Sequence, residues 1–526
     1  MKKIIRKLLS GYLLIIFLLL IELAFILVFQ FGSEDILTAF LGVNTKNGEI
    51  KTTLALSYMI LRLIVFIVAL FIFFKIINRQ EDPEFKIPWI VGILLMPFFF
   101  SAIFIIFGKN GLRKKDRLII KASKAAFKHR YERGDVEKEA LESAAGAFSY
   151  LRSATGLGCH ANNKITYFKN GEEFFADLIE KLKNAKEFIF MEFYLIADGS
   201  FWSEIRSVLI DKAKSGVEVR LVYDDMGCGG TISSLTPRIL KKHGVSCFKF
   251  HPFRPILSAM YNNRDHRKIV VIDHDYAYTG GINLADEYGN RIQKFGYWKD
   301  CMIRLEGSAV NNLITVFLQN YDIAQGKVSD YDKYLSYEYQ KFDEKGYIMP
   351  FGDGPGDIDG YLIGEQTYVN ILHYARSEVY ISTPYLVPTY QLLDALRNAA
   401  LRGVKVHLIL PAVPDKPLIY KVAESNFRFL MDAGVKIYRY APGFNHMKTI
   451  IADGRLALVG SINLDFRSLV HHFECGALMF DCACLKDIAE DFKQMLLSCE
   501  PVPPDFEQKP AARRLCSLIK IISPLL

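Results

Sequence analysis

Three long apolar runs open the chain, over residues 8–31, 54–74 and 87–107. A helix needs about 20 apolar residues to cross a hydrocarbon layer about 30 Å thick, and each run is long enough. The first run is too long for a signal peptide and lacks a small-residue cleavage site. The pattern therefore predicts a membrane region over residues 1–108, with about three apolar helices.

Two of these runs carry a charge, Glu22 in the first and Arg62 in the second. A charge inside a membrane is costly unless it meets a partner, so we expect these two side chains to pair. Positive residues flank the membrane region on both sides: Lys2, Lys3, Arg6 and Lys7 before it, and Arg113, Lys114, Lys115 and Arg117 after it. Three spans cannot place both groups on the cytoplasmic side, so this rule leaves the orientation open.

The pattern changes after the membrane region. Residues 109–152 are polar and basic, and they indicate a helical connector near lipid headgroups. From residue 153, short β-branched or aromatic runs alternate with amphipathic stretches such as 171–185 and 390–402. This alternation predicts an α/β fold, with mostly parallel sheets flanked by helices. A glycine-rich seam after residue 351 divides it into domains at 153–350 and 351–500, and a basic amphipathic tail follows at 501–526.

One chemical motif occurs twice, once in each of the two domains. Both copies read His-x-Lys-x4-Asp and continue to a small residue and an asparagine at identical offsets: His266, Lys268, Asp273, Gly281 and Asn283, then His446, Lys448, Asp453, Ser461 and Asn463. Flanking blocks repeat in the same order, for example Gly-Val-Glu-Val-Arg from residue 216 and Gly-Val-Lys-Val-His from residue 403. A duplicated domain explains this order, so the two copies should build one site together.

Each copy of the motif predicts a β-hairpin, because apolar runs flank a polar turn at 273–275 and again at 453–455. If the first turn is centred between residues 274 and 275, Lys268 faces Gly281 and His266 faces Asn283. Side chains alternate along a strand, so His, Lys, the small residue and Asn would share one face. The motif aspartates have the opposite parity, and this geometry assigns them to holding the hairpin.

The shared face would hold an imidazole, an ammonium and an amide from each copy, without a carboxylate cluster to bind a metal. Such a set suits a phosphate: Lys and Asn hold its free oxygens, one His attacks phosphorus and the other supplies a proton. A catalytic imidazole needs a partner on its other nitrogen. Asp300, which follows His266, and Glu474, which follows His446, are the candidates for this role. The two half-sites contain the same types of residue, so the sequence does not show which histidine attacks first.

Charge and cysteine content add to this picture. The formal net charge of +8 favours an anionic surface, either lipid or nucleic acid. Nine cysteines without regular spacing favour a reducing compartment and argue against a disulfide framework.

The paired motifs resemble those of the phospholipase D superfamily, and the resemblance covers about residues 150–500. Within it, Tyr-Asp-Asp-Met-Gly from residue 223, Gly-Gly-Ile-Asn-Leu-Ala-Asp-Glu-Tyr from 280, Thr-Pro-Tyr-Leu-Val-Pro from 383 and Gly-Ser-Ile-Asn-Leu-Asp-Phe-Arg-Ser from 460 look like bacterial cardiolipin synthases. The apolar N-terminal runs fit this subgroup too, although its members often have two spans. His472 stands where the family commonly has Asn.

The resemblance implies a reaction without cofactor or metal, in which two phosphatidylglycerol molecules yield cardiolipin and glycerol. His266 would form a phosphatidyl-histidine intermediate, and His446 would be the acid and base. Each site residue takes a role from the family: His266, Lys268, Asp273, His446, Lys448 and Asp453 as the catalytic set, Asn283, Asn463, Ser461 and Gly281 at the phosphate, and Asp300 and Glu474 orienting the imidazoles. The expected place is the bacterial cell membrane, multi-pass, with a cytoplasmic catalytic domain and anionic lipids as partners.

Three other functions compete with this one. A membrane phospholipase D that hydrolyses the intermediate, or transfers another headgroup, would need the same residues, because acceptor choice depends on pocket shape and water exclusion. A phosphodiesterase acting on nucleic acid is disfavoured by the apolar runs and by the lack of an evident base-stacking platform. Two intact motifs argue against a non-catalytic scaffold. The sequence leaves homo-oligomer formation open.

Overall fold

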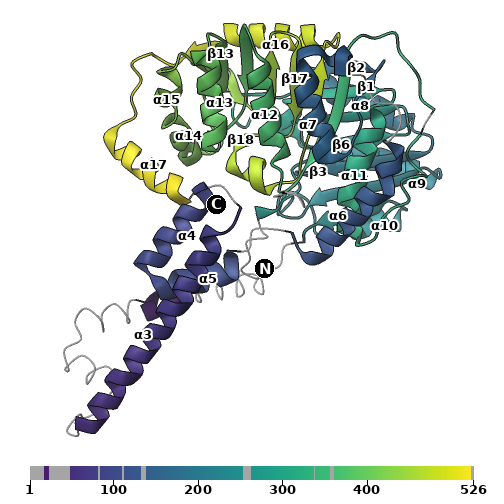
Figure 1. The fold of residues 1–526 in the computed structure, drawn as a ribbon. Helices are drawn as coiled ribbons and strands as arrows, with labels where there is room; N and C mark the ends of the chain where they lie inside the picture. The colour runs from purple at the N-terminus through teal and green to yellow at the C-terminus, as the bar shows by residue number, and fades with distance from the viewer. Residues whose placement is uncertain are drawn as a thin grey trace. The chain divides into compact units, whose positions relative to one another are not determined.

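The computed structural model describes residues 17–22, 48–80, 83–108, 112–131, 138–252, 262–336, 338–355 and 360–522. The chain forms two compact units. The first, which we call the apolar unit, consists mainly of residues 1–111, and the second, the α/β unit, consists of Leu112–Phe253 and Asn262–Ser517. Figure 1 shows the long helix of the apolar unit and the layered sheets and helices of the α/β unit.

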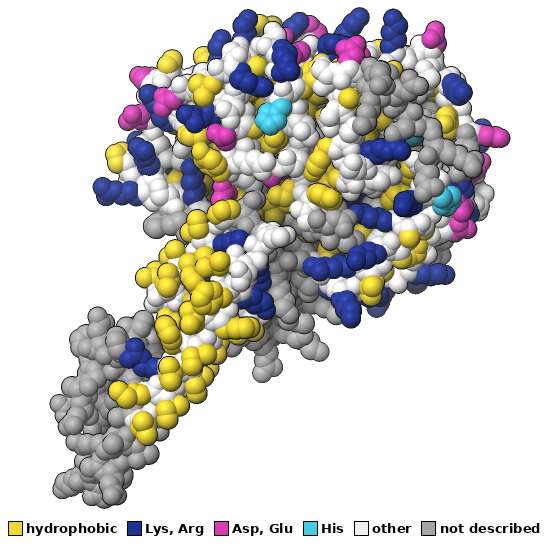
Figure 2. All heavy atoms as spheres, in the orientation of Figure 1, with side chains coloured by type: hydrophobic (Ala, Val, Ile, Leu, Met, Phe, Trp, Pro, Cys, Tyr) yellow, Lys and Arg dark blue, Asp and Glu magenta, His cyan; other side chains and the backbone are white. Residues whose placement is uncertain are grey.

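Helix α3 (Gly48–Ile77) dominates the apolar unit. Its stretch Met59–Ile77 is long and apolar enough to cross a membrane, and it is the one such helix among the described residues. Its apolar side chains are largely exposed, and Figure 2 shows hydrophobic groups covering the helices of this unit. The run at 54–74 is therefore helical as expected, whereas the run at 8–31 lies outside the described residues except for 17–22.

The expectation of one spanning helix over 87–107 is wrong. The structure forms two short helices instead, α4 (Pro83–Leu95) with 13 residues and α5 (Pro97–Phe107) with 11 residues. Pro97 disfavours helical backbone at the preceding residue. Met96 is indeed non-helical, with φ −140° and ψ 76°. At about 1.5 Å per residue, the helices are about 20 Å and about 17 Å long, shorter than a hydrocarbon core of about 30 Å. They pack with α3 around Trp89, Ile93 and Phe104.

Glu22 has a different partner from the one we expected. Its buried carboxylate accepts a hydrogen bond from the backbone N–H of Phe99, at 2.9 Å. Phe99 lies in the first turn of α5. There, N–H groups have no partner within the helix and the helix dipole favours a negative charge. The start of α5 therefore takes the place that we had assigned to Arg62.

Two mixed sheets organise the α/β unit. The seven-stranded sheet has the order β2-β9-β7-β6-β3-β4-β5. Its strands are β2 (Lys164–Phe168), β3 (Phe188–Phe193), β4 (Glu218–Asp224), β5 (Ser246–Phe250), β6 (Lys268–Ile272), β7 (Tyr276–Gly280) and β9 (Met302–Glu306). The nine-stranded sheet has the order β1-β10-β19-β17-β16-β11-β13-β14-β20. Its strands are β1 (His160–Ala161), β10 (Tyr347–Asp353), β11 (Glu378–Ser382), β13 (Lys405–Pro411), β14 (Lys436–Tyr440), β16 (Thr449–Ala452), β17 (Leu456–Gly460), β19 (Glu474–Phe480) and β20 (Cys499–Pro501).

The two sheets repeat one topology. The order β9-β7-β6-β3-β4-β5 in the first matches β19-β17-β16-β11-β13-β14 in the second. Only β3-β4-β5 and β11-β13-β14 are parallel, and all other pairs in these sheets are antiparallel. The expected mostly parallel sheets are therefore wrong, because each motif hairpin and the strand after it add antiparallel neighbours through short connections.

Helices cover both faces of these sheets. They are α6 (Lys114–Phe127), α7 (Ala145–Thr155), α8 (Gly171–Lys183), α9 (Ser200–Lys214), α10 (Thr236–Lys242), α11 (Val310–Gln325), α12 (Ile363–Tyr374), α13 (Tyr390–Leu401), α14 (Pro417–Glu424), α15 (Phe427–Met431) and α16 (Leu485–Leu497). Short helical turns lie at Lys128–Arg130, Lys138–Ala144, Asp286–Gly289 and Arg467–His471, and α17 (Pro510–Ile522) forms within the basic tail. Capping side chains start two helices, since Asn170 accepts from Glu173 N and Thr389 from Leu392 N.

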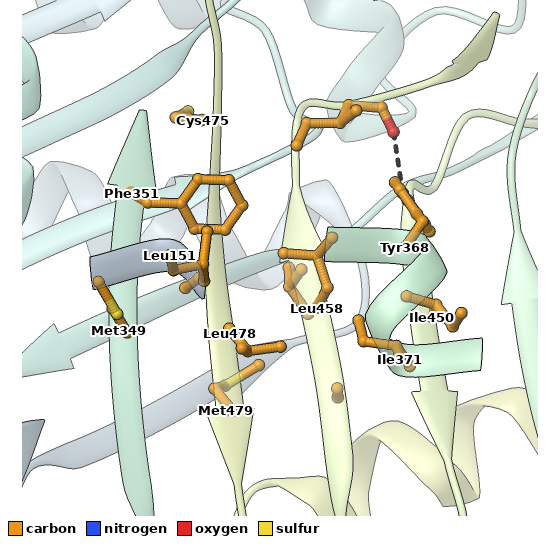
Figure 3. Packing of buried hydrophobic residues seen from close by; sticks show 14 of the residues in the cluster. Leu151, Met349, Phe351, Tyr368, Ile371, Ile450, Leu458, Cys475, Leu478 and Met479 are labelled. Atoms are coloured by element: carbon orange, nitrogen blue, oxygen red, sulfur yellow. Dashed lines mark hydrogen bonds between the residues drawn. The ribbon is translucent and has the colours of Figure 1, made fainter. Parts of the chain in front are cut away.

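One hydrophobic core joins the two halves. It includes Phe190 and Ile269 of the first sheet together with Leu458 and Leu478 of the second. Figure 3 shows part of it, where Leu458 and Leu478 lie between α7 and α12, and where Tyr368 donates to Ile462 O. A second core fills the other face of the first sheet. The domain boundaries near residues 350 and 500 remain a prediction. The second sheet also contains β1, from the beginning of the first half, which pairs with β10.

Replacement of Leu458 by Ala tests this shared core. Leu458 is 1% exposed. Its loss leaves a cavity, so we expect the free energy of unfolding to fall by about 2–5 kcal/mol. Leu401→Ala is the matched control, since Leu401 is 59% exposed. A surface substitution of this kind should change stability by about 0.5 kcal/mol at most. Denaturant unfolding in detergent measures both, and equal effects would contradict the described packing.

Candidate functional site

Both motif hairpins form, with a register that differs by one residue from the expected one. Ile269 pairs with Thr279 and Thr449 with Val459, so each hairpin is centred on the middle residue of a three-residue turn. The cause is the first turn residue in each copy. Asp273 (φ 53°) and Asp453 (φ 52°) adopt the left-handed conformation. Three-residue hairpin loops contain a residue in this conformation.

The carboxylates of these motif aspartates hold the start of a neighbouring strand. Asp273 accepts hydrogen bonds from the N–H groups of Lys186, Glu187 and Phe188 at 2.7–2.8 Å. Asp453 repeats this pattern with residues 376–378, at 2.7–2.9 Å. Both aspartates therefore lie at the turns, at the opposite end of the strands from the histidines. We place them outside the chemical centre, although the motif counts them with the catalytic set.

The two histidines obtain their carboxylates from opposite halves of the chain. Nδ1 of His266 lies 2.9 and 3.0 Å from the two carboxylate oxygens of Glu474. Nδ1 of His446 lies 2.6 Å from Oδ2 of Asp300. All four side chains are buried. The structure thus brings both candidate acids to the imidazoles, each crossing from the other half.

Backbone pairing between the halves fixes this exchange. Strand β15 (Gly443–Asn445), just before His446, runs parallel to β8 (Tyr297–Lys299), just before Asp300. The backbone N–H of His446 donates to Lys299 O at 2.7 Å, and that of His266 donates to Phe473 O at 2.8 Å. Each histidine is therefore held beside the residue that precedes the acid of the other half.

The small residues of the motif contact these acids. Ser461 Oγ donates a short hydrogen bond to Glu474. At the equivalent Gly281, a Cβ atom would lie 2.1 Å from Oδ1 of Asp300, so the absent side chain makes room for that carboxylate. We had expected both residues at the phosphate, and the structure places them against the acids.

The lysines and asparagines of the motif are buried. Lys268 donates to the carbonyl oxygen of His266 and Lys448 to that of His446. Asn283 accepts from Leu195 N at 3.1 Å and donates to the hydroxyl of Tyr288 at 2.7 Å. The backbone N–H of Asn463 donates to the hydroxyl of Ser468 at 3.1 Å.

Burial sets the charge states at the centre. It lowers the pKa of His266 and of His446, so both imidazoles are neutral near pH 7. It also lowers the pKa of Lys268 to about 8 and that of Lys448 to about 7. Near neutral pH the centre therefore holds two neutral imidazoles beside two ammonium groups that are close to losing their protons.

The two acids differ in charge. Burial raises the pKa of Asp300 to about 7. Burial acts on Glu474 in the same direction, but His266 and several hydrogen bonds outweigh it and lower the pKa of Glu474. The hydroxyls of Ser461 and Ser468 both donate to Glu474, whereas the other donor to Asp300 is the backbone N–H of Cys301. Glu474 is therefore fully ionised near pH 7, whereas Asp300 is partly protonated at that pH.

One group in the described residues has the composition of a metal site. Ligand atoms of His266, His472 and Glu474 lie within 4.8 Å of one another. Both oxygens of Glu474 already accept hydrogen bonds from serine hydroxyls, and His266 uses Nδ1 for the same carboxylate. These hydrogen bonds orient Glu474 and His266.

Sequence reasoning missed three buried charged residues beside His266. The guanidinium of Arg267 donates to the carbonyl oxygens of Glu474, Val316 and Asp353, each at 2.9 Å, and so ties the first motif to the second sheet. Asp265 and Glu192 are buried close to each other, and burial raises the pKa of both. The sequence offered one signal for these residues, which is that Asp265 directly precedes His266 of the motif.

Comparison with known proteins identifies the class. Residues 178–293 and 368–496 match the family model described as "Cardiolipin synthase, PLD-like domain". A cardiolipin synthase of Geobacillus sp. is 32% identical and covers 93% of this chain and 97% of the relative, and cardiolipin synthase 2 of Bacillus cereus is 34% identical over 85% and 88%. A Streptococcus mutans protein described as uncharacterized is 40% identical over 86% and 98%.

The fold has a counterpart among solved structures. Phosphatidylserine synthase of Haemophilus influenzae aligns with a TM-score of 0.55 at 16% identity, over 73% of this chain and 100% of that one. The chain belongs to the cardiolipin synthase family of phospholipase D-like proteins. It is an enzyme of the phosphatidyltransferase class, which confirms the resemblance read from the paired motifs.

Gly281→Ala tests the fit of Asp300 against the first hairpin. The added Cβ would displace the carboxylate from His446. A shift of about 1 Å at a catalytic group costs about 100-fold in kcat. Gly146→Ala is the control, since a Cβ at Gly146 meets nothing within 4 Å. We expect phosphatidyl transfer to fall in the first variant alone, and unchanged transfer in Gly281→Ala would contradict this placement.

The two lysines predict a pH dependence. Each ammonium is charged below its pKa, so the ability to hold an anionic phosphate is lost as the pH rises through about 7 to 8. We expect kcat/KM to fall across this interval, since it reports the free enzyme. The surface variant Lys486→Gln should keep the same profile. A kcat/KM that stays constant to about pH 9 would show that the charged lysines are not needed.

Proposed function

We propose that this enzyme is a cardiolipin synthase that transfers the phosphatidyl group of one phosphatidylglycerol to a second and releases glycerol. The observation that carries the proposal is the paired centre itself, with two buried imidazoles, each bound to a carboxylate of the other half. Relatives named cardiolipin synthase over most of the chain support the choice of lipid.

In the first step, Nε2 of His266 attacks the phosphorus of the donor. A P–N bond forms while the P–O bond to the glycerol headgroup breaks. The leaving oxygen takes the Nε2 proton of His446 while Nδ1 of His446 takes a proton from Lys448 or Asp300, so the imidazole stays neutral. Ionised Glu474 holds the Nδ1 proton of His266. This contact leaves the lone pair on Nε2 for attack and stabilises the cationic imidazole in the adduct. Phosphatidyl-histidine and free glycerol result.

The contacts of His446 support its role as the acid. Lys448 Nζ lies 2.8 Å from Nδ1 of His446. An ammonium can only donate there. A protonated Asp300 would also donate to Nδ1. Both contacts favour the tautomer of His446 that carries its proton on Nε2. His266 and His446 are thus differentiated, with the lone pair free on one Nε2 and the proton on the other.

In the second step, His446 takes the proton from a headgroup hydroxyl of the second phosphatidylglycerol. That oxygen attacks phosphorus, the P–N bond breaks and cardiolipin forms. One phosphodiester replaces another, so the exchange needs no nucleotide. Lys268, Lys448, Asn283 and Asn463 would hold the free phosphate oxygens in both steps. Asp300 and Glu474 would orient the imidazoles.

We propose that the α/β unit acts at the cytoplasmic face of a bacterial cell membrane. All nine cysteines are free, as a reducing compartment requires. The exposed apolar surface of α3 provides one candidate span. Phosphatidylglycerol and other anionic lipids are then the partners of the enzyme.

Mass spectrometry of the lipids tests the reaction. Purified protein is incubated in vesicles with phosphatidylglycerol alone, without nucleotide or divalent metal. We expect cardiolipin and glycerol, with none in His266→Ala. Rapid quenching of the wild type should locate phosphorus on His266. Phosphatidic acid as the product would indicate a hydrolytic phospholipase D instead, and phosphorus on His446 would reverse the assigned order.

A further inference from the structure

Helix α6 (Lys114–Phe127) is fixed on the α/β unit through one face. Ile119, Ile120 and Phe127 join the shared core, and Ser123 donates to Asp322 of α11 at 3.0 Å. Asp116 is buried as well, 3.1 Å from Nε2 of His251. These contacts determine which side of the helix is exposed.

The exposed side is cationic. Its residues, which we call the basic face, are Lys114, Lys115, Arg117 and Lys121 of α6 and Lys128 directly after it, with Leu118 among them. None of these five cations forms an ion pair with any residue that the structure describes, and Leu118 is 59% exposed. Figure 2 shows Lys and Arg side chains gathered along the edge of the unit where Figure 1 places α6.

We propose that the basic face binds the surface of an anionic bilayer. Clusters of four to eight Lys or Arg residues on an amphipathic helix attract anionic headgroups. Helix α6 begins at Lys114, seven residues after α5 ends at Phe107. An exposed Leu118 amid the cations suits shallow insertion among the headgroups.

Helix α16 (Leu485–Leu497) provides a contrast within the same unit. Its exposed Lys486 and Lys493 are interspersed with the acids Asp487 and Glu490, so the charges offset one another. Figure 1 places α16 and α6 at opposite edges of the α/β unit. The basic face is therefore a local feature of α6. Bound to a bilayer, it would concentrate anionic lipid beside the unit, in a way that salt weakens.

Lysine acylation of the full chain in nanodiscs tests the proposal. Nanodiscs of phosphatidylcholine are compared with nanodiscs that also contain phosphatidylserine, and labelling is read for each lysine by mass spectrometry. We expect the lysines of the basic face to be labelled about fivefold less in the anionic nanodiscs, with Lys486 and Lys493 unchanged. High salt should restore the labelling. Equal labelling in both nanodiscs, or protection that persists in high salt, would overturn the proposal.

A pair of charge-matched variants completes the test. Lys114→Gln with Lys121→Gln should restore labelling of Lys115 and Lys128 in the anionic nanodiscs, whereas Lys486→Gln with Lys493→Gln should leave their protection intact. Protection that survives the first pair would contradict the basic face. Phosphatidylserine is not the donor of the proposed reaction, so this outcome does not depend on the proposed function.

Discussion

The hydrogen bonds that cross between the two halves, from His266 to Glu474 and from His446 to Asp300, are the constraint on which the rest of the structure depends. Each half supplies a histidine that is oriented by an acid of the other half, and an acid that orients the histidine of the other half. The parallel pairing of β8 with β15 and the buried guanidinium of Arg267 keep the halves in the required register. Since one core fills the space between both sheets, the centre is complete only when both halves are folded and packed together.

Duplication gave two similar half-sites, and single substitutions made them different. Ser461 donates to Glu474, whereas Gly281 leaves space for Asp300. The two acids also differ in pKa, since burial raises that of Asp300 while His266 and His472 lower that of Glu474. Asp265, directly before His266, belongs to a buried acid pair, whereas its counterpart Asn445 is hydrogen-bonded to neutral Ser382. Two chemically distinct histidines are what a nucleophile and an acid require, and identical environments would make them compete for one role.

The alternation of apolar and amphipathic stretches was enough to predict the α/β class. The repeated motif predicted the hairpins and the histidines and lysines gathered at the centre. It did not predict that Asp300 and Glu474 would exchange partners, because no local signal in a sequence reports a contact between its halves. The hairpin register was missed since it depends on the left-handed backbone of Asp273, which is stabilised by three distant N–H groups. The break at Met96 was readable from Pro97, but hydropathy over 87–107 is uniform and concealed it.

Nitrogen-15 NMR of histidine-labelled protein tests the crossed pairing most directly, because the shift of each Nδ1 reports its hydrogen-bond partner. The signals are assigned by their loss in His266→Asn and His446→Asn. The account predicts that Glu474→Gln changes Nδ1 of His266 and leaves His446 in place, and that Asp300→Asn does the reverse. A change at His266 in Asp300→Asn, with none in Glu474→Gln, would contradict it and pair each histidine with the acid of its own half.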